Sequence, residues 1–171
     1  MGKINYLVPL IPQEDNPICW IACVAMVKSW KEQATLSIAD FTGGADPSNS
    51  CISNVDIAGF KRRLRDFGFV LDGRNMSINY QYIESRLRQN GPFIFFVYVA
   101  NFPFFGPYCL NVRGGAKDSH AMIVTGMDTD KEEVYIMNPW GTEVPPVKLD
   151  DLVGLLQEFA DDGRDPVAFL P

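Results

Sequence analysis

An unbroken run of ten apolar residues, from Ile18 to Val27, constrains the fold of this 171-residue chain more than any other feature. The run predicts a helix that begins at Ile18 and continues to about Glu32. Asn16 is placed to cap this helix, and Pro17 suits its first position. Ten residues cannot cross a bilayer, which needs about twenty. A helix that is apolar on nearly every side is the buried helix of a domain, so other elements must pack around it.

Amphipathic patterns predict three further helices, over 56–67, 79–89 and 148–160. Asp56 is placed to cap the first of them. Gly68 ends the first helix and the Asn90-Gly91 pair ends the second. The residues expected to face the core are Ile57, Phe60, Leu64 and Phe67 in the first helix, and Tyr80, Ile83 and Leu87 in the second.

The second half of the chain is richer in strands. Aromatic and β-branched runs predict strands over 93–99, 120–127 and 133–137, and a short apolar end covers 167–170. Helices largely precede strands, which indicates an α+β fold with an N-terminal helical subdomain facing a C-terminal antiparallel β-sheet subdomain. The length and the 47% hydrophobic content predict one domain spanning 1–171.

Charge and targeting features exclude several classes of partner. Fifteen Lys and Arg residues against 21 Asp and Glu give a net charge of −6, so the chain lacks the basic surface that nucleic-acid binding requires. We therefore expect no nucleic-acid partner and, without an apolar span, no membrane partner. The chain opens with no secretion signal, so we expect cytoplasmic synthesis.

Cysteine and histidine counts limit the available chemistry. The four cysteines, Cys19, Cys23, Cys51 and Cys109, are too sparse for a disulfide framework and lack the close pairs of a zinc site. We expect all four to be reduced. His120 is the only histidine, which excludes a site built on several histidines. We expect neither a metal nor a cofactor.

Four residues have side chains suited to thiol chemistry, although each could be structural. Cys19 falls in the first turn of the buried helix, where the helix dipole and a nearby imidazolium would lower a thiol pKa, but it could be a small core residue. His120 begins a strand, Asn138 opens an Asn-Pro-Trp-Gly turn, and Gln13 precedes Cys19 by six residues.

The order and setting of these residues resemble the papain superfamily of cysteine peptidases. The segment 13–20 (QEDNPICW) is similar to its Gln-x5-Cys-Trp motif, and 119–126 (SHAMIVTG) is similar to its His-Ala strand. Gly91-Pro92 and the apolar strand that follows it resemble the family's strand leading toward the histidine. The segment 135–141 (YIMNPWG) is similar to the Asn-Ser-Trp-Gly turn, with Pro139 in place of serine. The resemblance covers residues 13–141 and implies a papain-like fold with a central helix.

Departures from papain itself narrow the resemblance. Cys19 and His120 are only 101 residues apart, and the pro-region and disulfides of the lysosomal relatives are absent. The chain is more similar to compact bacterial members of the superfamily. These are small effector proteases and the peptidase domains that remove double-glycine leaders.

The resemblance implies a role for each residue. Cys19 would be the nucleophile, His120 the proton shuttle and Asn138 the residue that orients the imidazole. Gln13 and the Cys19 backbone N–H would form the oxyanion hole. Trp140 would shield the bond between His120 and Asn138 from water.

Other residues near these motifs have alternative interpretations. Cys23 and Trp20 are expected to pack in the core. Asp118 could tune the imidazole or be a solvated loop carboxylate. The aromatic segment 102–108 (FPFFGPY) either covers the sheet or lines a substrate or partner groove.

The predicted function is that of a cysteine peptidase acting on a protein or peptide substrate. The resemblance favours a bacterial effector or toxin that is delivered into a recipient cell and held inactive by a cognate inhibitor or immunity protein. The alternatives are a leader-processing peptidase, a deamidase, acyltransferase or transglutaminase using the same triad, and an inert papain-fold binding module.

Overall fold

The computed structural model of this chain describes residues 2–13, 18–43, 57–98, 119–141 and 144–171. The helices in these ranges are α1 (Cys19–Glu32), α2 (Ala39–Thr42), α3 (Ile57–Asp66), α4 (Tyr80–Asn90) and α5 (Leu149–Asp161). The strands are β1 (Lys3–Asn5), β2 (Val70–Asp72), β3 (Phe93–Tyr98), β4 (Ser119–Asp128), β5 (Glu133–Met137), β6 (Val147–Lys148) and β7 (Val167–Phe169).

The described strands form one antiparallel sheet in the order β2-β7-β3-β4-β5-β6. β1 pairs with the far end of β4, past a bulge between Val124 and Gly126. A side chain at Gly126 would place its Cβ 2.2 Å from the carbonyl oxygen of Ile4, so only glycine allows β1 to approach this closely.

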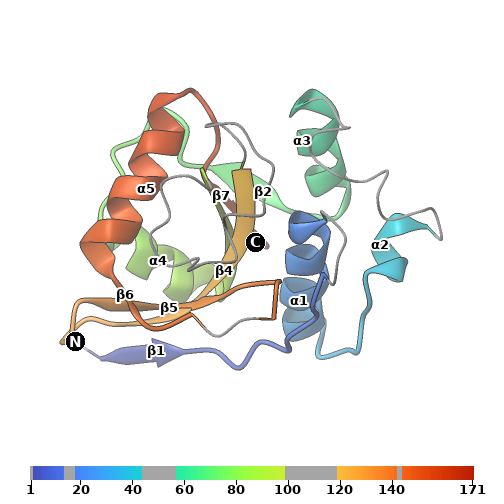
Figure 1. The fold of residues 1–171 in the computed structure, drawn as a ribbon, viewed down its shortest axis with the longest axis horizontal. Coiled ribbons are helices and arrows are strands. Elements are labelled where there is room, and N and C mark those ends of the chain that lie inside the picture. Colours follow the sequence, from blue (N-terminus) through green and yellow to red (C-terminus); the bar gives the residue numbers. More distant parts are fainter. Residues whose placement is uncertain (1, 14–17, 44–56, 99–118, 142–143) are drawn as a thin grey trace.

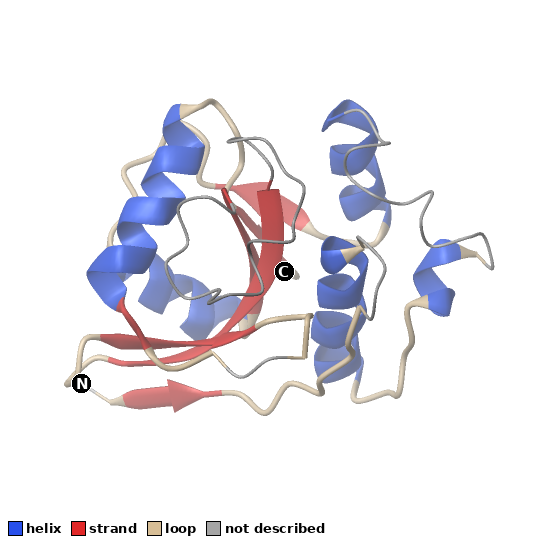
Figure 2. Ribbon diagram, in the orientation of Figure 1, coloured by secondary structure: helices blue, strands red, loops and turns tan. Residues whose placement is uncertain are grey.

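Helices cover both faces of the sheet, with α1 on one face and α4 and α5 on the other (Figure 1). The sequence of β3 is continuously apolar because its side chains alternate between two cores. Its even-numbered residues Ile94, Phe96 and Tyr98 pack on the α1 side, and its odd-numbered residues pack on the α4 and α5 side. The colouring by secondary structure shows the same layering (Figure 2).

The predicted central helix is confirmed as a buried helix. Residues 20–27 of α1 are at most 1% exposed. At the other end of this helix, Trp30 packs so tightly against Gly91 that a Cβ there would lie 2.2 Å from the indole ring. Gly91 also adopts a φ of +82°, which glycine tolerates best. The Gly-Pro turn therefore brings β3 directly against α1.

The structure corrects several details of the sequence prediction. α1 begins at Cys19, and its N-cap is Ile18 rather than Asn16. Tyr80, expected to face the core with Ile83 and Leu87, is 49% exposed because it occupies the first position of α4, ahead of the buried face. Asn16, Pro17 and Asp56 lie outside the described residues.

The other predicted helices and strands are present, within one or two residues of their expected bounds. β1, α2, β2 and β6 were not predicted, because elements of two to four residues are too short to show a period. The helices that the structure describes include none with the length and apolar character of a membrane span.

Candidate active site

Sheet topology brings His120 and Asn138 together. His120 is the second residue of β4, and Asn138 directly follows β5. Because these neighbouring strands are antiparallel, the start of β4 and the end of β5 lie at the same edge of the sheet. His120 and Asn138 are 3% and 2% exposed.

The contact between these two side chains fixes the tautomer of the imidazole. His120 Nε2 lies 3.0 Å from Asn138 Oδ1, which also accepts the backbone N–H of Trp140 over 3.1 Å. A backbone N–H can only donate, so the atom facing it is the amide oxygen of Asn138. His120 Nε2 must therefore carry a proton, and in the neutral ring the basic lone pair belongs to Nδ1.

Burial keeps the imidazole neutral. Desolvation lowers the pKa of His120 from 6.5 to about 4, and the hydrogen bond to Asn138 opposes only part of this shift. The ring of Trp140 lies against the imidazole, with 4.5 Å between the ring centroids. Burial thus disfavours the charged form of the ring. The expectation that an imidazolium adds a full charge near Cys19 stays a prediction.

Cys19 meets β4 at the residue that follows His120. Its Sγ accepts the backbone N–H of Ala121 over 3.5 Å. Cys19 is the first residue of α1, and the Ile18 N-cap has no side-chain acceptor to offer the N–H groups of the first turn. That turn contains no acidic residue either, so the positive end of the helix dipole acts on a sulfur that is 8% exposed.

Cys23 lies one turn further along α1 and has a different environment. It is a free thiol that is fully buried, and burial raises its pKa well above the usual range, with the nearby Cys19 adding to the shift. Cys23 is therefore a protonated core residue, as expected. Trp20 is likewise buried, in edge-to-face contact with Phe60 of α3. Cys51 and Cys109 lie outside the described residues.

Gln13 is joined to the turn that carries Asn138. Its backbone N–H donates to the carbonyl oxygen of Pro139 over 2.8 Å, and its side chain is buried. The turn is closed by a bond from Gly141 N–H to the Asn138 carbonyl oxygen, with Gly141 at a φ of +78°. These backbone bonds tie the position of Gln13 to that of Asn138.

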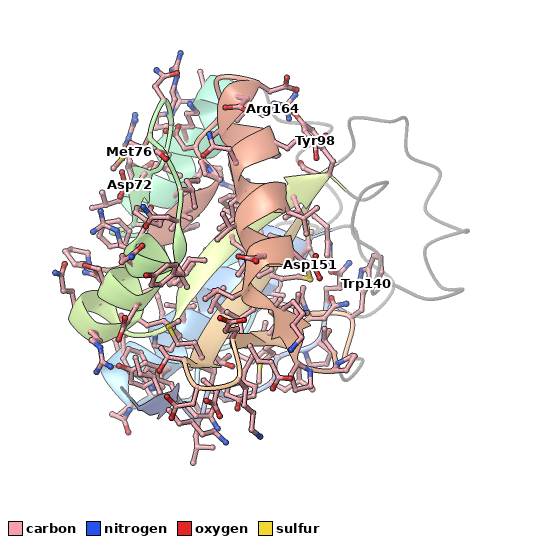
Figure 3. All side chains as sticks on the ribbon, turned by 90° about the vertical axis from the view of Figure 1, so that its left-hand side faces the viewer. Asp72, Met76, Tyr98, Trp140, Asp151 and Arg164 are labelled. Atoms are coloured by element: carbon pink, nitrogen blue, oxygen red, sulfur yellow. The ribbon has the colours of Figure 1, made fainter. Side chains whose placement is uncertain are left out.

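The end of β3 beside His120 is anchored to the segment after α5. Tyr98 pairs in register with Ser119, and its hydroxyl donates to Asp162 Oδ2 over 2.6 Å. The guanidinium of Arg164 stacks 5.4 Å from the Tyr98 ring centroid. Figure 3 shows Tyr98 and Arg164 together near the C-terminal end of α5, with Trp140 on the same side of the view.

Backbone groups are the part of the site that sequence reasoning missed. The N–H groups of Ala121, Trp140 and Gln13 each make a contact that positions a site residue, and a backbone amide has no signature in the sequence. Asp118 and the aromatic segment 102–108 lie outside the described residues. In the described part of the chain, no group of three or more His, Cys, Asp or Glu residues is placed to hold a metal ion.

Comparisons with known proteins bear on the family and the fold of this chain. The family described as papain-like cysteine protease AvrRpt2 matches residues 3–151. A protein described as a C39-like peptidase from Bacillus anthracis has a similar structure, with a TM-score of 0.64, 11% identity and coverage of 100% of this chain and 98% of its own.

A second solved structure is more distant. It is a double glycine motif protease from an AMS/PCAT transporter in complex with the leader peptide, with a TM-score of 0.46, 14% identity and coverage of 99% of this chain and 96% of its own. No curated protein matches the chain. The family match and the Bacillus anthracis structure confirm the predicted α+β papain-like fold.

Proposed function

We propose that this chain, which belongs to the family of the papain-like cysteine protease AvrRpt2, hydrolyses peptide bonds with Cys19 as its nucleophile. Family membership makes the protein a cysteine peptidase. The proposal concerns the residues that perform the reaction, and the contacts from Cys19 through Ala121 and His120 to Asn138 support it. Within the described residues, the thiol contacts the backbone of the residue that follows His120, and the imidazole contacts the amide that fixes its tautomer.

The reaction begins with a proton transfer between Cys19 and His120. Nδ1 of His120 takes the Sγ proton while Sγ attacks the carbonyl carbon of the scissile bond. The Cys19 backbone N–H and the side-chain amide of Gln13 donate to the oxyanion. The imidazolium then gives its proton to the leaving nitrogen, the C–N bond breaks and an amine departs. A thioester remains on Cys19.

Water completes the cycle. His120 Nδ1 takes a proton from a water molecule whose oxygen attacks the thioester carbonyl. The C–S bond breaks, the sulfur regains a proton and the carboxyl product leaves. Asn138 holds the ring throughout, because its Oδ1 accepts Nε2–H in both the neutral and the charged form. The sequence of steps uses no cofactor.

A thioester can also pass its acyl group to acceptors other than water. Deamidation of a glutamine side chain, acyl transfer and transglutamination would start from the same intermediate. Product analysis separates these outcomes, since a peptidase creates a new amine terminus and a deamidase releases ammonia. A leader-processing peptidase would cleave one short precursor segment. An inert binding module would form no acyl-enzyme at all.

The biological role that we propose is that of a bacterial effector or toxin acting on specific proteins in a recipient cell. Cys23 is a free thiol in the described structure, which suits a reducing compartment. A protease working there needs narrow specificity or a cognate inhibitor, and an immunity protein covering the site would provide the latter. The peptidase would occupy one domain over residues 1–171.

Comparison of protein termini tests the function directly. A host-cell lysate is treated with the wild-type protein or with Cys19→Ala, and new amine termini are identified by mass spectrometry. We expect a small set of cleavage sites only with the wild type, while Cys23→Ala, the matched control, gives the same set. Equal patterns for the wild type and Cys19→Ala would contradict the proposed nucleophile.

A further inference from the structure

Helix α3 carries a concentrated positive charge in an acidic chain. Lys61, Arg62, Arg63 and Arg65 are four of the 15 basic residues of the chain, and they lie within five consecutive positions. Asp66 is the only acidic residue of this helix. By contrast, α5 contains four acidic residues and no basic one. Charge is therefore segregated between these helices, within a chain whose net charge is −6.

The side chains of Arg62 and Arg65 are exposed on the outer side of α3. Among the described residues, neither arginine lies within ion-pairing distance of a carboxylate. The basic residues of other helices that do pair with a carboxylate are Lys28, Arg86 and Arg88. The helix dipole favours a cation at Arg65 in the last turn, but it does not account for Arg62. Both guanidinium groups can therefore receive a carboxylate from another molecule.

α3 packs against the start of α1, the helix that begins with Cys19. The Phe60 ring meets the Trp20 ring edge to face, with 5.3 Å between the ring centroids. The guanidinium of Arg63 lies 5.0 Å from the centroid of the Trp20 ring. Trp20 directly follows Cys19 in the chain, and Figure 1 shows α3 next to α1. A polypeptide bound to α3 would therefore lie close to the proposed nucleophile.

An acidic polypeptide fits this surface better than a membrane or a nucleic acid. Arginine binds carboxylates with two parallel hydrogen bonds, which gives the contact a defined geometry. A membrane-binding helix needs exposed apolar anchors beside its basic residues, and none of the large apolar side chains exposed in the described structure lies on residues 58–66 of α3. The net charge of −6 would repel the phosphate backbone of a nucleic acid.

We propose that Arg62 and Arg65 form a docking site on α3 for an acidic segment of the protein substrate. This inference rests on the proposed function, because it places the segment beside Cys19. A single exposed ion pair contributes little and is screened by salt, so the two arginines together would supply selectivity among substrates rather than tight binding.

A peptide library derived from a bacterial proteome tests the selectivity. The library is treated with the wild type, with Arg62→Glu/Arg65→Glu, or with Arg74→Glu/Lys131→Glu, and cleavage sites are identified by mass spectrometry. The last variant is the matched control, because it makes the same change in net charge at two exposed cations outside α3. We expect Asp and Glu to be enriched near the sites that the wild type and the control cleave, and this enrichment to disappear in the α3 variant.

The rate for the best-cleaved acidic peptide of the library gives the size of the effect. At low ionic strength we expect kcat/KM to fall about 5–30-fold in Arg62→Glu/Arg65→Glu, the scale of two ion pairs in water. High ionic strength should reduce this difference. Arg62→Gln/Arg65→Gln, which adds no negative charge to the helix, should lose a smaller part of the rate. The same acidic preference in all variants, with native circular dichroism, would overturn the proposal.

A binding assay without turnover separates this inference from the proposed function. A rhodamine-labelled hexaglutamate peptide is titrated with Cys19→Ala protein and followed by fluorescence anisotropy, with a hexaglutamine peptide as its neutral counterpart. We expect binding of hexaglutamate to weaken in the Arg62→Glu/Arg65→Glu background and to be retained in Arg62→Lys/Arg65→Lys. A protein that cleaves no peptide but shows this difference would contradict the peptidase proposal and support the docking site. An active peptidase that binds hexaglutamate equally in every background would do the reverse.

Two other occupants of α3 would give different results in the same variants. Flotation with phosphatidylserine vesicles that is lost only in Arg62→Glu/Arg65→Glu, without any preference for acidic peptides, would assign the surface to a membrane and overturn the proposal. A dimer in sedimentation velocity that only this variant abolishes, again without a peptide preference, would assign it to a second copy of the chain and equally overturn it.

Discussion

At the scale of single residues, the two described cysteines of α1 are chemically distinct although they are one turn apart. Cys19 lies at the helix terminus and accepts an N–H from β4, whereas Cys23 is enclosed by the core, where burial raises its pKa. We expect Cys19 to react with iodoacetamide near pH 6 faster than any other cysteine, as judged by peptide mass spectrometry. Labelling of Cys23 at the same rate would contradict this assignment.

The acceptor role of Asn138 gives an ordered mutational series. His120→Ala should lose about 10²–10⁴-fold in kcat/KM, the usual contribution of a general acid–base residue. Asn138→Ala should lose less, because Trp140 still packs on the ring, and Asn138→Asp should lose least, because a carboxylate oxygen also accepts Nε2–H and the Trp140 amide. Peptide hydrolysis measures the series, and an Asn138→Ala variant as inactive as His120→Ala, with native folding, would refute the order.

The pH dependence of activity follows from the buried imidazole. Burial lowers the pKa of His120 to about 4, so the neutral base is present above that pH and is lost as the pH falls through it. The acid limb of kcat/KM, which reports the free enzyme, should therefore lie below the 6.5 of an ordinary imidazole. Asn138→Asp places a negative charge beside the ring and should move the limb to higher pH. A wild-type limb at 6.5 would contradict the buried neutral ring.

At the scale of elements, the bulge in β4 decides how β1 joins the sheet. Gly126→Ala would force a Cβ against the Ile4 carbonyl, so we expect the free energy of unfolding to fall by about 1–3 kcal/mol. Gly154→Ala is the matched control. Apart from its chain neighbours and the nearby backbone of its own helix, no described atom lies within 4 Å of the Cβ it would add to α5, and alanine should stabilise that helix by up to about 1 kcal/mol. Urea denaturation measures both, and equal effects of the two substitutions would refute the close approach of β1.

At the scale of the whole molecule, the two cores share a strand and should unfold together. β3 sends alternate side chains to the α1 side and to the α4 and α5 side, so neither core can persist once β3 leaves the sheet. We expect amide hydrogen exchange in α1 and α5 to lose protection at one denaturant midpoint. Separate midpoints would indicate two units and contradict the expectation of one domain over 1–171.

The sequence by itself predicted the features that periodicity and side-chain chemistry encode. The apolar run of α1, the amphipathic helices and the long strands follow from local patterns of burial. The residue types of the thiol site and their order along the chain were also recognisable, since Cys19, His120 and Asn138 occur within motifs. These features require no knowledge of which elements touch.

Only the tertiary structure decided the features that depend on backbone groups and on contacts between distant segments. Three contacts of the site are donated by backbone N–H groups, which every residue except proline possesses. They are the hydrogen bonds from Ala121 to Cys19 Sγ, from Trp140 to Asn138 Oδ1 and from Gln13 to the Pro139 carbonyl oxygen. The lowered pKa of His120 was likewise not predictable, because desolvation depends on what the fold packs around a ring. The sequence determines which side chains are available, and the packing of β4 against α1 determines their burial and their contacts.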